Sequence, residues 1–216
     1  MIDPETGLLR TLAWNLFDWS KTNCDHPVLL QNSMFLVGAL TAAIELGESL
    51  GEPVEAFRGQ REELKRAINA QWDARKLAWP DSIHADGTVS DASMHTSMLA
   101  LLYDAANREH VAAARANTVT PRAELIRVAS PFAALYLYEA FEKIGMADEI
   151  LKTIYRDYLP MLRLGSTTVW ETFPAALNTG EFPTRSHCHG WSAAPLYFLP
   201  RLVLGILPAA PGAMKF

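Results

Sequence analysis

The sequence has few of the features that define several protein classes. It contains two cysteines in 216 residues, Cys24 and Cys188, and neither belongs to a C-x-x-C unit, so a disulfide framework or a zinc knuckle is not supported. No uninterrupted apolar run reaches the roughly 18 residues of a membrane span. The N-terminal MIDPETGLLR lacks the basic-then-apolar layout of a signal peptide. We therefore expect a cytoplasmic chain with no membrane partner.

The charged residues also exclude a class of partner. The formal net charge is -5 and the sequence pI is near 5.7, and Lys and Arg form no cluster comparable to a surface that follows a phosphate backbone. Nucleic acid is therefore not an expected partner. The length fits one domain, and we predict a single domain over residues 1–216.

Helical periodicity dominates the chain, and strand-like alternation is nearly absent. Pro27 and Gly47 bound the first apolar helical pattern, Ser130 and Pro131 form an N-cap and first-turn signal, and Gly145 and Gly205 are stop signals. These patterns predict about seven helices, over residues 27–47, 53–73, 92–107, 108–117, 130–145, 146–162 and 191–204.

The order of these helices favours pairs joined by short loops, with two long polar exceptions at residues 79–91 and 165–190. Helical pairs in tandem are typical of a solenoid or of a toroid of hairpins. Because no fixed-period repeat is present, we predict an all-α chain that forms a toroid of helical hairpins. In the 79–91 loop, Asp81 and Asp86 are expected to make Asx turns and Asp91 to cap a helix.

The 165–190 loop carries the chemistry that the sequence suggests. Thr167 to Trp170 favour an extended backbone that places Glu171 beside a large aromatic side chain. A carboxylate next to an indole is partly desolvated, which raises its pKa toward the range useful for proton transfer. The alternative is that Trp170 belongs to the core and Glu171 is a solvated loop acid.

His187 and His189 flank Cys188 in the same loop. We expect one of them to face a cavity while the other packs. No third ligand lies at a helix-spaced position, so we expect no metal. A Cys-His nucleophile is disfavoured for neighbours in sequence, and we expect a buried thiol instead.

A second aromatic and acidic turn precedes the first long helix. Asp18 and Trp19 stand in WNLFDWSKTNCDHP, and they fit either a binding loop or a loop that leads into the helix and buries its Trp. Both interpretations stay open at this point.

Two quoted segments carry a family resemblance. GSTTVWETF, residues 165–173, followed by PTRSHCHGWSAAPLYFLPRLVLGILP, residues 183–208, resembles the end of the catalytic domain of family 78 glycoside hydrolases, the α-L-rhamnosidases. More loosely, LLRTLAWNLFDW resembles the family segment that leads to an Asp-Trp turn. DSIHADGTVSDASMHTSMLALLYDAA and SPFAALYLYEAFEKIGM resemble the helices that follow it.

The resemblance implies a six-hairpin α/α toroid that hydrolyses terminal α-L-rhamnosides with inversion and needs no metal or other cofactor. By match to the family's T-T-x-W-E motif, Glu171 would be the general base. His189 would bond the sugar, with His187 as the alternative, Trp170 and Asp18 would border the sugar, and Trp19 would line the pocket on a weaker match.

The family's general acid lies in a motif close to R-D-E-R-x-G-W-x-G-D, and no D-E-R occurs in this sequence. About seven helices also fall short of the twelve that close six hairpins, so the resemblance implies an all-α, incomplete α/α toroid with one long irregular loop at residues 165–190. We therefore expect a C-terminal part of the catalytic domain, with weak or no activity alone, that forms a homo-oligomer or joins a missing N-terminal part. The alternative is a non-catalytic carbohydrate-binding or helical interaction module.

Overall fold

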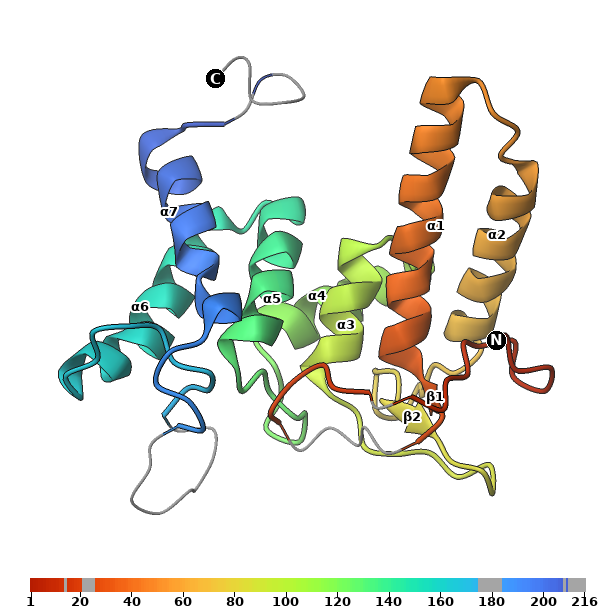
Figure 1. Ribbon diagram of the computed structural model, residues 1–216. Coiled ribbons are helices and arrows are strands. Elements are labelled where there is room, and N and C mark those ends of the chain that lie inside the picture. The colour runs from red at the N-terminus through yellow and green to blue at the C-terminus, as the bar shows by residue number, and fades with distance from the viewer. Residues whose placement is uncertain (14, 21–25, 175–183, 208, 210–216) are drawn as a thin grey trace. The chain divides into compact units, whose positions relative to one another are not determined.

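The computed structural model describes residues 1–13, 15–20, 26–174, 184–207 and 209 (Figure 1). The chain divides into two compact units, Met1–Val128 and Ala129–Phe216, and each is described by itself. The prediction of a single domain stays a prediction.

The first unit is built from two helical hairpins and a small antiparallel ribbon. The ribbon pairs β1 (Val28–Leu29) with β2 (Ser82–Ile83), with Val28 opposite Ile83. Helix α1 (Leu30–Leu50) packs on α2 (Glu55–Asn69), and α3 (Met94–Leu102) packs on α4 (Arg108–Val119). Contacts between α1 and α3 join the two hairpins.

Each hairpin of this unit has an apolar helix and a more polar one. Every residue of α3 from Met94 to Leu101 is buried, whereas α2 buries only Leu64, Ile68 and Asn69 among its fifteen residues. A helix that is apolar on most sides must lie in the core, and one with a single apolar stripe covers it. The unit's core therefore lies along α1 and α3.

Helix α1 ends at a glycine for a geometric reason. Gly51 has a φ of 72°, and the amide of Glu52 returns to the carbonyl of Gly47 at 2.8 Å. This bond closes a Schellman-type C-cap, which requires a left-handed residue that glycine adopts without a Cβ clash. The helix end that the sequence predicts at Gly47 thus lies about one turn before the observed end of α1.

By length and composition, α1 is the one described helix that could cross a membrane, with a mean hydropathy of 1.3 over its most apolar window. The core helix of a globular unit meets the same criteria. In this structure 28% of that window is buried, and α1 packs on α2 and α3.

The second unit contains α5 (Pro131–Lys143), α6 (Ala147–Arg163), the 3₁₀ turn η1 (Gly190–Ser192) and α7 (Ala194–Leu204). Tyr138 of α5 meets Phe198 of α7 edge to face at 5.5 Å, and both rings are fully buried. Arg201 of α7 donates to Glu142 of α5 at 2.8 Å. The phenol of Tyr158 on α6 donates to the carbonyl of Ser192 at 3.0 Å and ties η1 to the helices.

Seven α-helices within the described residues match the seven predicted ones, and the all-α class is confirmed. The predicted Pro131 signal lies at the start of α5, although the Ser130 side chain makes no cap bond. Two expectations for the 79–91 loop are wrong. Ser93, not Asp91, caps α3, and Asp81 is buried, not part of an Asx turn. Asp86 does make such a turn, accepting from the amide of Thr88 at 3.0 Å.

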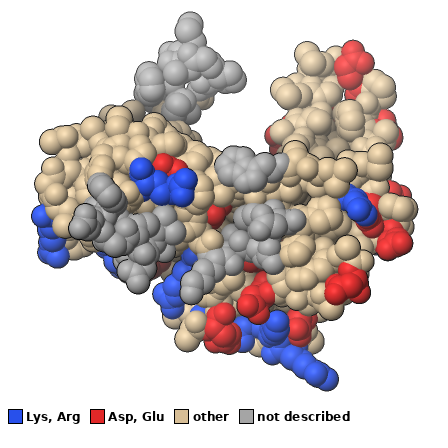
Figure 2. Space-filling view, turned by 60° about the horizontal axis from the view of Figure 1, so that its bottom comes forward, with Lys and Arg blue, Asp and Glu red and all other residues tan. Residues whose placement is uncertain are grey.

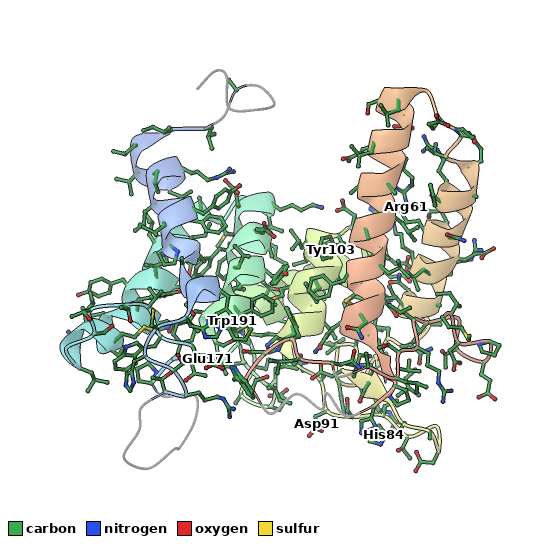
Figure 3. All side chains as sticks on the ribbon, in the orientation of Figure 1. Arg61, His84, Asp91, Tyr103, Glu171 and Trp191 are labelled. Carbon is green, nitrogen blue, oxygen red and sulfur yellow. The ribbon has the colours of Figure 1, made fainter. Side chains whose placement is uncertain are left out.

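Gly38 provides a test of the packing between α1 and the end of α3. A Cβ at this position would lie 2.4 Å from a ring carbon of Tyr103, which is labelled beside α1 in Figure 3. We expect Gly38→Ala to lower the free energy of unfolding by about 1–3 kcal/mol, because the ring must move.

Gly59 is the matched control, since a Cβ there meets nothing within 4 Å and the residue lies inside α2. Gly59→Ala should raise the free energy of unfolding by about 0.5–1 kcal/mol through helix propensity. Urea unfolding measures both, and an equal gain from the two substitutions would contradict the packing described here.

Candidate active site

Backbone pairing in the second unit brings the two ends of the long polar loop together. The amide of Glu171 donates to the carbonyl of Ser186, and the amide of His189 donates to the carbonyl of Val169, both at 3.0 Å. The hydroxyl of Thr184 accepts from the amide of Thr172 at 3.2 Å. Residues 175–183 lie outside the described residues. Glu171 is thus held beside the segment that carries both histidines.

Glu171 lies between two groups that can carry positive charge. Its Oε1 is 3.6 Å from Arg185 Nε, and its Oε2 is 3.8 Å from His189 Nδ1. The residue is 9% exposed, while the Arg185 side chain is half exposed. Both separations exceed a direct hydrogen bond, so these are loose charge contacts rather than tight ion pairs. The sequence interpretation of Glu171 as a solvated loop acid is therefore wrong.

A group of aromatic rings continues from His189. The His189 ring lies 4.1 Å from that of Trp191, and Trp191 stacks on Phe132 of α5 at 4.8 Å with an interplanar angle of 27°. Phe132 in turn meets Tyr136 edge to face. Figure 3 labels Trp191 of this group and also Glu171. The His189 and Trp191 rings are tilted by 48° against each other, so Trp191 packs against the imidazole that lies beside the carboxylate.

The other two predicted residues of this loop pack together. Trp170 is 4% exposed and meets His187 edge to face at 4.9 Å. The hydroxyl of Thr168 donates to the carbonyl of His187. His187 thus packs on Trp170, and His189 packs on Trp191. A contact of Trp170 or His187 with a ligand stays a prediction.

The cysteine expectation needs a correction. Cys188 is a free, exposed thiol rather than a buried one, since its neighbours in the extended segment face Trp170 and Trp191. Cys24 lies outside the described residues. Among the described residues, no group of three or more His, Cys, Asp or Glu side chains is placed to hold a metal ion.

In the first unit, Asp18 is buried with a histidine that the sequence did not single out. The side chains of Asp18 and His95 are both 0% exposed, and His95 Nε2 lies 2.6 Å from Asp18 Oδ2. The other oxygen of Asp18 accepts from the amide of Trp19 at 2.8 Å. Trp19 itself is half-buried.

A second buried carboxylate lies behind this pair. The hydroxyl of Ser93 donates to Asp81 Oδ1 at 2.5 Å and accepts from the amide of His95 at 3.1 Å. Burial raises the pKa of Asp81 to about 6, although His95 and the Ser93 hydroxyl oppose the shift. Within the described part of the chain, Asp81 Oδ2 and His95 Nδ1 have no hydrogen-bond partner.

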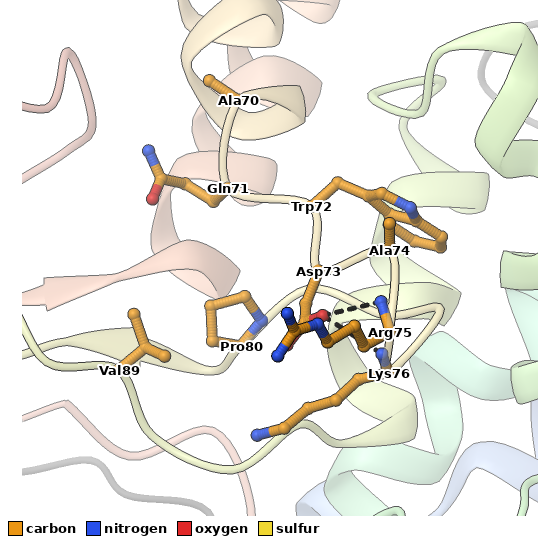
Figure 4. Close-up of a pocket in the computed structure, with 9 residues that line it drawn as sticks. All are labelled: Ala70, Gln71, Trp72, Asp73, Ala74, Arg75, Lys76, Pro80 and Val89. Atoms are coloured by element: carbon orange, nitrogen blue, oxygen red, sulfur yellow. Dashed lines mark hydrogen bonds between the residues drawn. The ribbon is translucent and has the colours of Figure 1, made fainter.

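A separate pocket of about 500 Å³ in the first unit contains none of the predicted residues (Figure 4). Trp72, Arg75, Lys76 and Val89 are among the residues that line it. Asp73 Oδ1 accepts from the amides of Arg75 and Lys76, and these bonds lower the pKa of Asp73. Because the Asp73 carboxylate already accepts two hydrogen bonds within its own turn, we assign no catalytic or binding role to this pocket. On the face drawn in Figure 2, acidic and basic side chains lie next to one another.

Three side chains of these clusters were missed at the level of sequence. Arg185 stands in the same polar loop as Glu171. A basic residue in the loop that carries the candidate acid could have been singled out from the sequence. His95 lies within an apolar helical pattern, and Asp81 in a turn-rich segment, so no local signal marks either as a buried partner.

A family model described as the bacterial α-L-rhamnosidase six-hairpin glycosidase domain matches residues 3–203. The chain belongs to this family, which confirms the resemblance read from the sequence and the toroid fold class.

Solved structures agree with this assignment. The chain is similar to a GH78 family rhamnosidase of Bacillus sp. GL1, with a TM-score of 0.90 and 38% identity over 98% of this chain. A rhamnosidase from Klebsiella oxytoca with rhamnose bound matches 91% of this chain, with a TM-score of 0.68 and 22% identity. A GH63 mannosylglycerate hydrolase from Thermus thermophilus matches 81%, with a TM-score of 0.60 and 16% identity. These last two show the fold alone.

The chain spans 23%, 38% and 45% of the length of these three proteins, in the same order. No curated protein sequence matches it.

Asp81 predicts a pH dependence of stability. Its folded pKa of about 6 lies above the usual value near 3.9, so the folded protein binds the proton more tightly than the unfolded chain does. The stability that this proton contributes is complete below about pH 4 and is lost as the pH rises through about 6. The free energy of unfolding of Asp81→Asn, minus that of the unchanged protein, should therefore grow by roughly 1–3 kcal/mol between pH 4 and pH 7.

Urea unfolding at several pH values measures this difference. Asp86→Asn is the control, because Asp86 is an exposed turn residue whose pKa is lowered by bonds to Thr88. A difference for Asp81→Asn that stays constant over this pH range would show that the carboxyl titrates alike in the folded and unfolded chains.

Proposed function

We propose that this chain carries the general-base half of an α-L-rhamnosidase active site, with Glu171 as the base that activates water. The observation that carries this proposal is the position of Glu171 between Arg185 and His189, in the T-T-x-W-E segment of a chain that belongs to the rhamnosidase family. The substrate class is a carbohydrate, and the specific sugar is a terminal α-L-rhamnoside.

The two flanking groups suit a general base. Arg185 and His189 approach different oxygens of the carboxylate, so they orient it without forming a tight ion pair that would block it. A water molecule bonded to Glu171 can lose a proton to it while attacking the anomeric carbon from the side opposite the leaving group. His189, fixed by Trp191, is available to bond a sugar hydroxyl.

Inverting hydrolysis also needs an acid on the other side of the glycosidic bond, with the two carboxyl groups about 6.5–9.5 Å apart. The sequence contains no segment like the family's R-D-E-R motif. We therefore propose that the acid comes from outside these 216 residues, either from a further segment of the same enzyme or from a second subunit.

The same sequence observation supports a second candidate. A chain that keeps the sugar-bonding groups but has no acid can act as a non-catalytic carbohydrate-binding or helical interaction module. Turnover separates the two candidates.

Hydrolysis of an aryl α-L-rhamnoside tests the proposal. We expect the isolated chain to react at least about 10²-fold more slowly than a full-length rhamnosidase, because the proton from the acid is missing. Glu171→Gln should abolish the remaining rate, since an amide cannot accept the proton from water.

Glu149→Gln makes the same chemical change on the surface of α6, where Glu149 pairs with Lys152, and should leave the rate unchanged. A rate equal to that of a full-length enzyme would refute the proposal that the general acid lies outside these 216 residues. A measurable rate that survives Glu171→Gln would refute the assigned base.

Exposed apolar side chains on α7 support a partner surface. Leucine, valine and tyrosine side chains along this helix are between 37% and 77% exposed: Leu196, Tyr197, Leu199, Val203 and Leu204. Contiguous apolar surface of this kind favours association. We propose that it contacts a second copy of the chain or the remaining part of the same enzyme.

We expect sedimentation velocity at micromolar concentration to show a dimer or a larger assembly. Val203→Glu should shift the chain toward a monomer, because a charge on the exposed apolar face resists burial. Leu50→Lys, at an exposed leucine of the first unit, is the control. A strictly monomeric profile for the unchanged chain would contradict self-association.

A further inference from the structure

The Thr184 side chain lies at the centre of the polar contacts beside Glu171. Its hydroxyl accepts from the Thr172 amide at 3.2 Å and from the Thr172 hydroxyl at 3.0 Å, and it donates to the Ser186 carbonyl at 3.3 Å. A hydroxyl has one proton to donate and two lone pairs that accept, so these three bonds use its full capacity. Thr172 is fully buried and Thr184 is 3% exposed, so water does not compete for the bonds.

The Ser186 carbonyl connects this hydroxyl to the candidate base. Besides the bond from the Thr184 hydroxyl, it accepts from the Glu171 amide at 3.0 Å. Glu171 and Thr172 are consecutive, so one carbonyl and one hydroxyl of the opposite segment hold their two amides. These groups close a ring of hydrogen bonds that includes the peptide between Glu171 and Thr172. We call this arrangement the Thr184 ring.

The Thr184 ring is attached to the helices of the second unit. The amide of Phe173, the next residue along the chain, donates to the carbonyl of Ala129 at 3.3 Å, two residues before α5. The Phe173 side chain is buried and meets the ring of Tyr158 on α6 edge to face at 5.4 Å. Through these contacts, the backbone beside Glu171 is linked to two helices that pack on each other.

The charged neighbours of Glu171 hold it less firmly than this ring does. Arg185 Nε and His189 Nδ1 lie 3.6 and 3.8 Å from the carboxylate, and their side chains are 52% and 32% exposed. Partly exposed charge contacts of this kind fix position weakly. Breaking a direct bond between buried groups, in contrast, leaves a donor or an acceptor unpaired, which is costly. The flanking charges can direct the carboxylate, but the ring determines where the Glu171 backbone lies.

We propose that Thr184 is a positioning residue for Glu171, because its hydroxyl fixes the backbone from which the candidate base extends. The catalytic part of this inference rests on the proposed function. Since Thr184 is almost fully buried, it acts through Thr172 and Ser186 rather than by contact with a substrate. A misplacement of about 1 Å can cost about 10²-fold in rate. The loss should fall on kcat rather than on KM, because proton transfer to Glu171 takes place in the transition state.

Three substitutions separate positioning from packing. Thr184→Val keeps the shape of the side chain and removes the hydroxyl, which leaves the Thr172 amide and hydroxyl without this acceptor. Thr184→Ser keeps the hydroxyl and loses a methyl group. Thr118→Val is the matched control, because Thr118 is equally buried and its hydroxyl donates to the Ala114 carbonyl within α4 of the first unit.

Two readouts report the position of Glu171 and need no turnover. In Thr184→Val, we expect amide exchange at Glu171 to rise at least about tenfold, because buried bonds of the ring are lost. In its crystal structure, the separation of 3.8 Å between Glu171 Oε2 and His189 Nδ1 should change by about 1 Å or more. Thr184→Ser and Thr118→Val should keep exchange within about threefold of the unchanged protein and leave the separation as it is.

Rates on an aryl α-L-rhamnoside add the catalytic readout. Thr184→Val should lower kcat by about 10- to 100-fold at an unchanged KM, and Thr184→Ser should restore it. Slow amide exchange along α5 and α6 establishes that the second unit is still folded. If Thr184→Val does not fold, Thr184→Cys takes its place, because a thiol is only a weak donor and acceptor.

The outcomes distinguish this inference from the proposed function. An unchanged exchange rate at Glu171, or an unchanged separation, in the variant without the hydroxyl overturns Thr184 as a positioning residue. A displaced Glu171 with an unchanged kcat overturns Glu171 as the base, and the positioning stands. If the unchanged chain does not hydrolyse the rhamnoside, the rates bear on the proposed function alone, and exchange and separation still decide whether Thr184 positions Glu171.

Discussion

Two backbone hydrogen bonds hold the candidate site together. The bonds from Glu171 to Ser186 and from His189 to Val169 align two extended segments that are otherwise joined by a long loop. This pairing gives Glu171 fixed neighbours, although neither segment belongs to a helix. The position of Arg185, the orientation of His189 and the stack on Trp191 all follow from it. The helices of this unit contribute the Phe132 ring, which stacks on Trp191, and the Tyr158 hydroxyl, which donates to the carbonyl of Ser192 in η1.

The first unit uses a different way of fixing a loop. Its core helices α1 and α3 are packed by apolar side chains, and a small set of polar side chains is buried among them. Burial of a carboxylate is costly unless it is bonded, and here Asp18 and Asp81 converge on the first turn of α3 through His95 and Ser93. These hydrogen bonds offset that cost, and they attach loop residues to the buried helix α3.

The sequence predicts the helices well and the polar contacts poorly, for a physical reason. Helices follow from a period of 3.6 residues and from stop signals such as Gly205, which has the left-handed φ of a C-cap. Glu171 and His189 could be proposed together because they stand in one loop. The partner of Asp18 is 77 residues away, and no local pattern reports such a contact. Asp81 has the sequence context of a turn residue, and only the tertiary packing shows that it is buried.

The central claim is that Glu171 and His189 form the sugar-facing half of a rhamnosidase site. A crystal structure of the chain with L-rhamnose tests it most directly. The account predicts a sugar whose hydroxyl bonds His189, with its anomeric carbon directed toward a water molecule on Glu171. A sugar bound away from residues 168–191, or bound there with Glu171 turned away from it, would contradict the account.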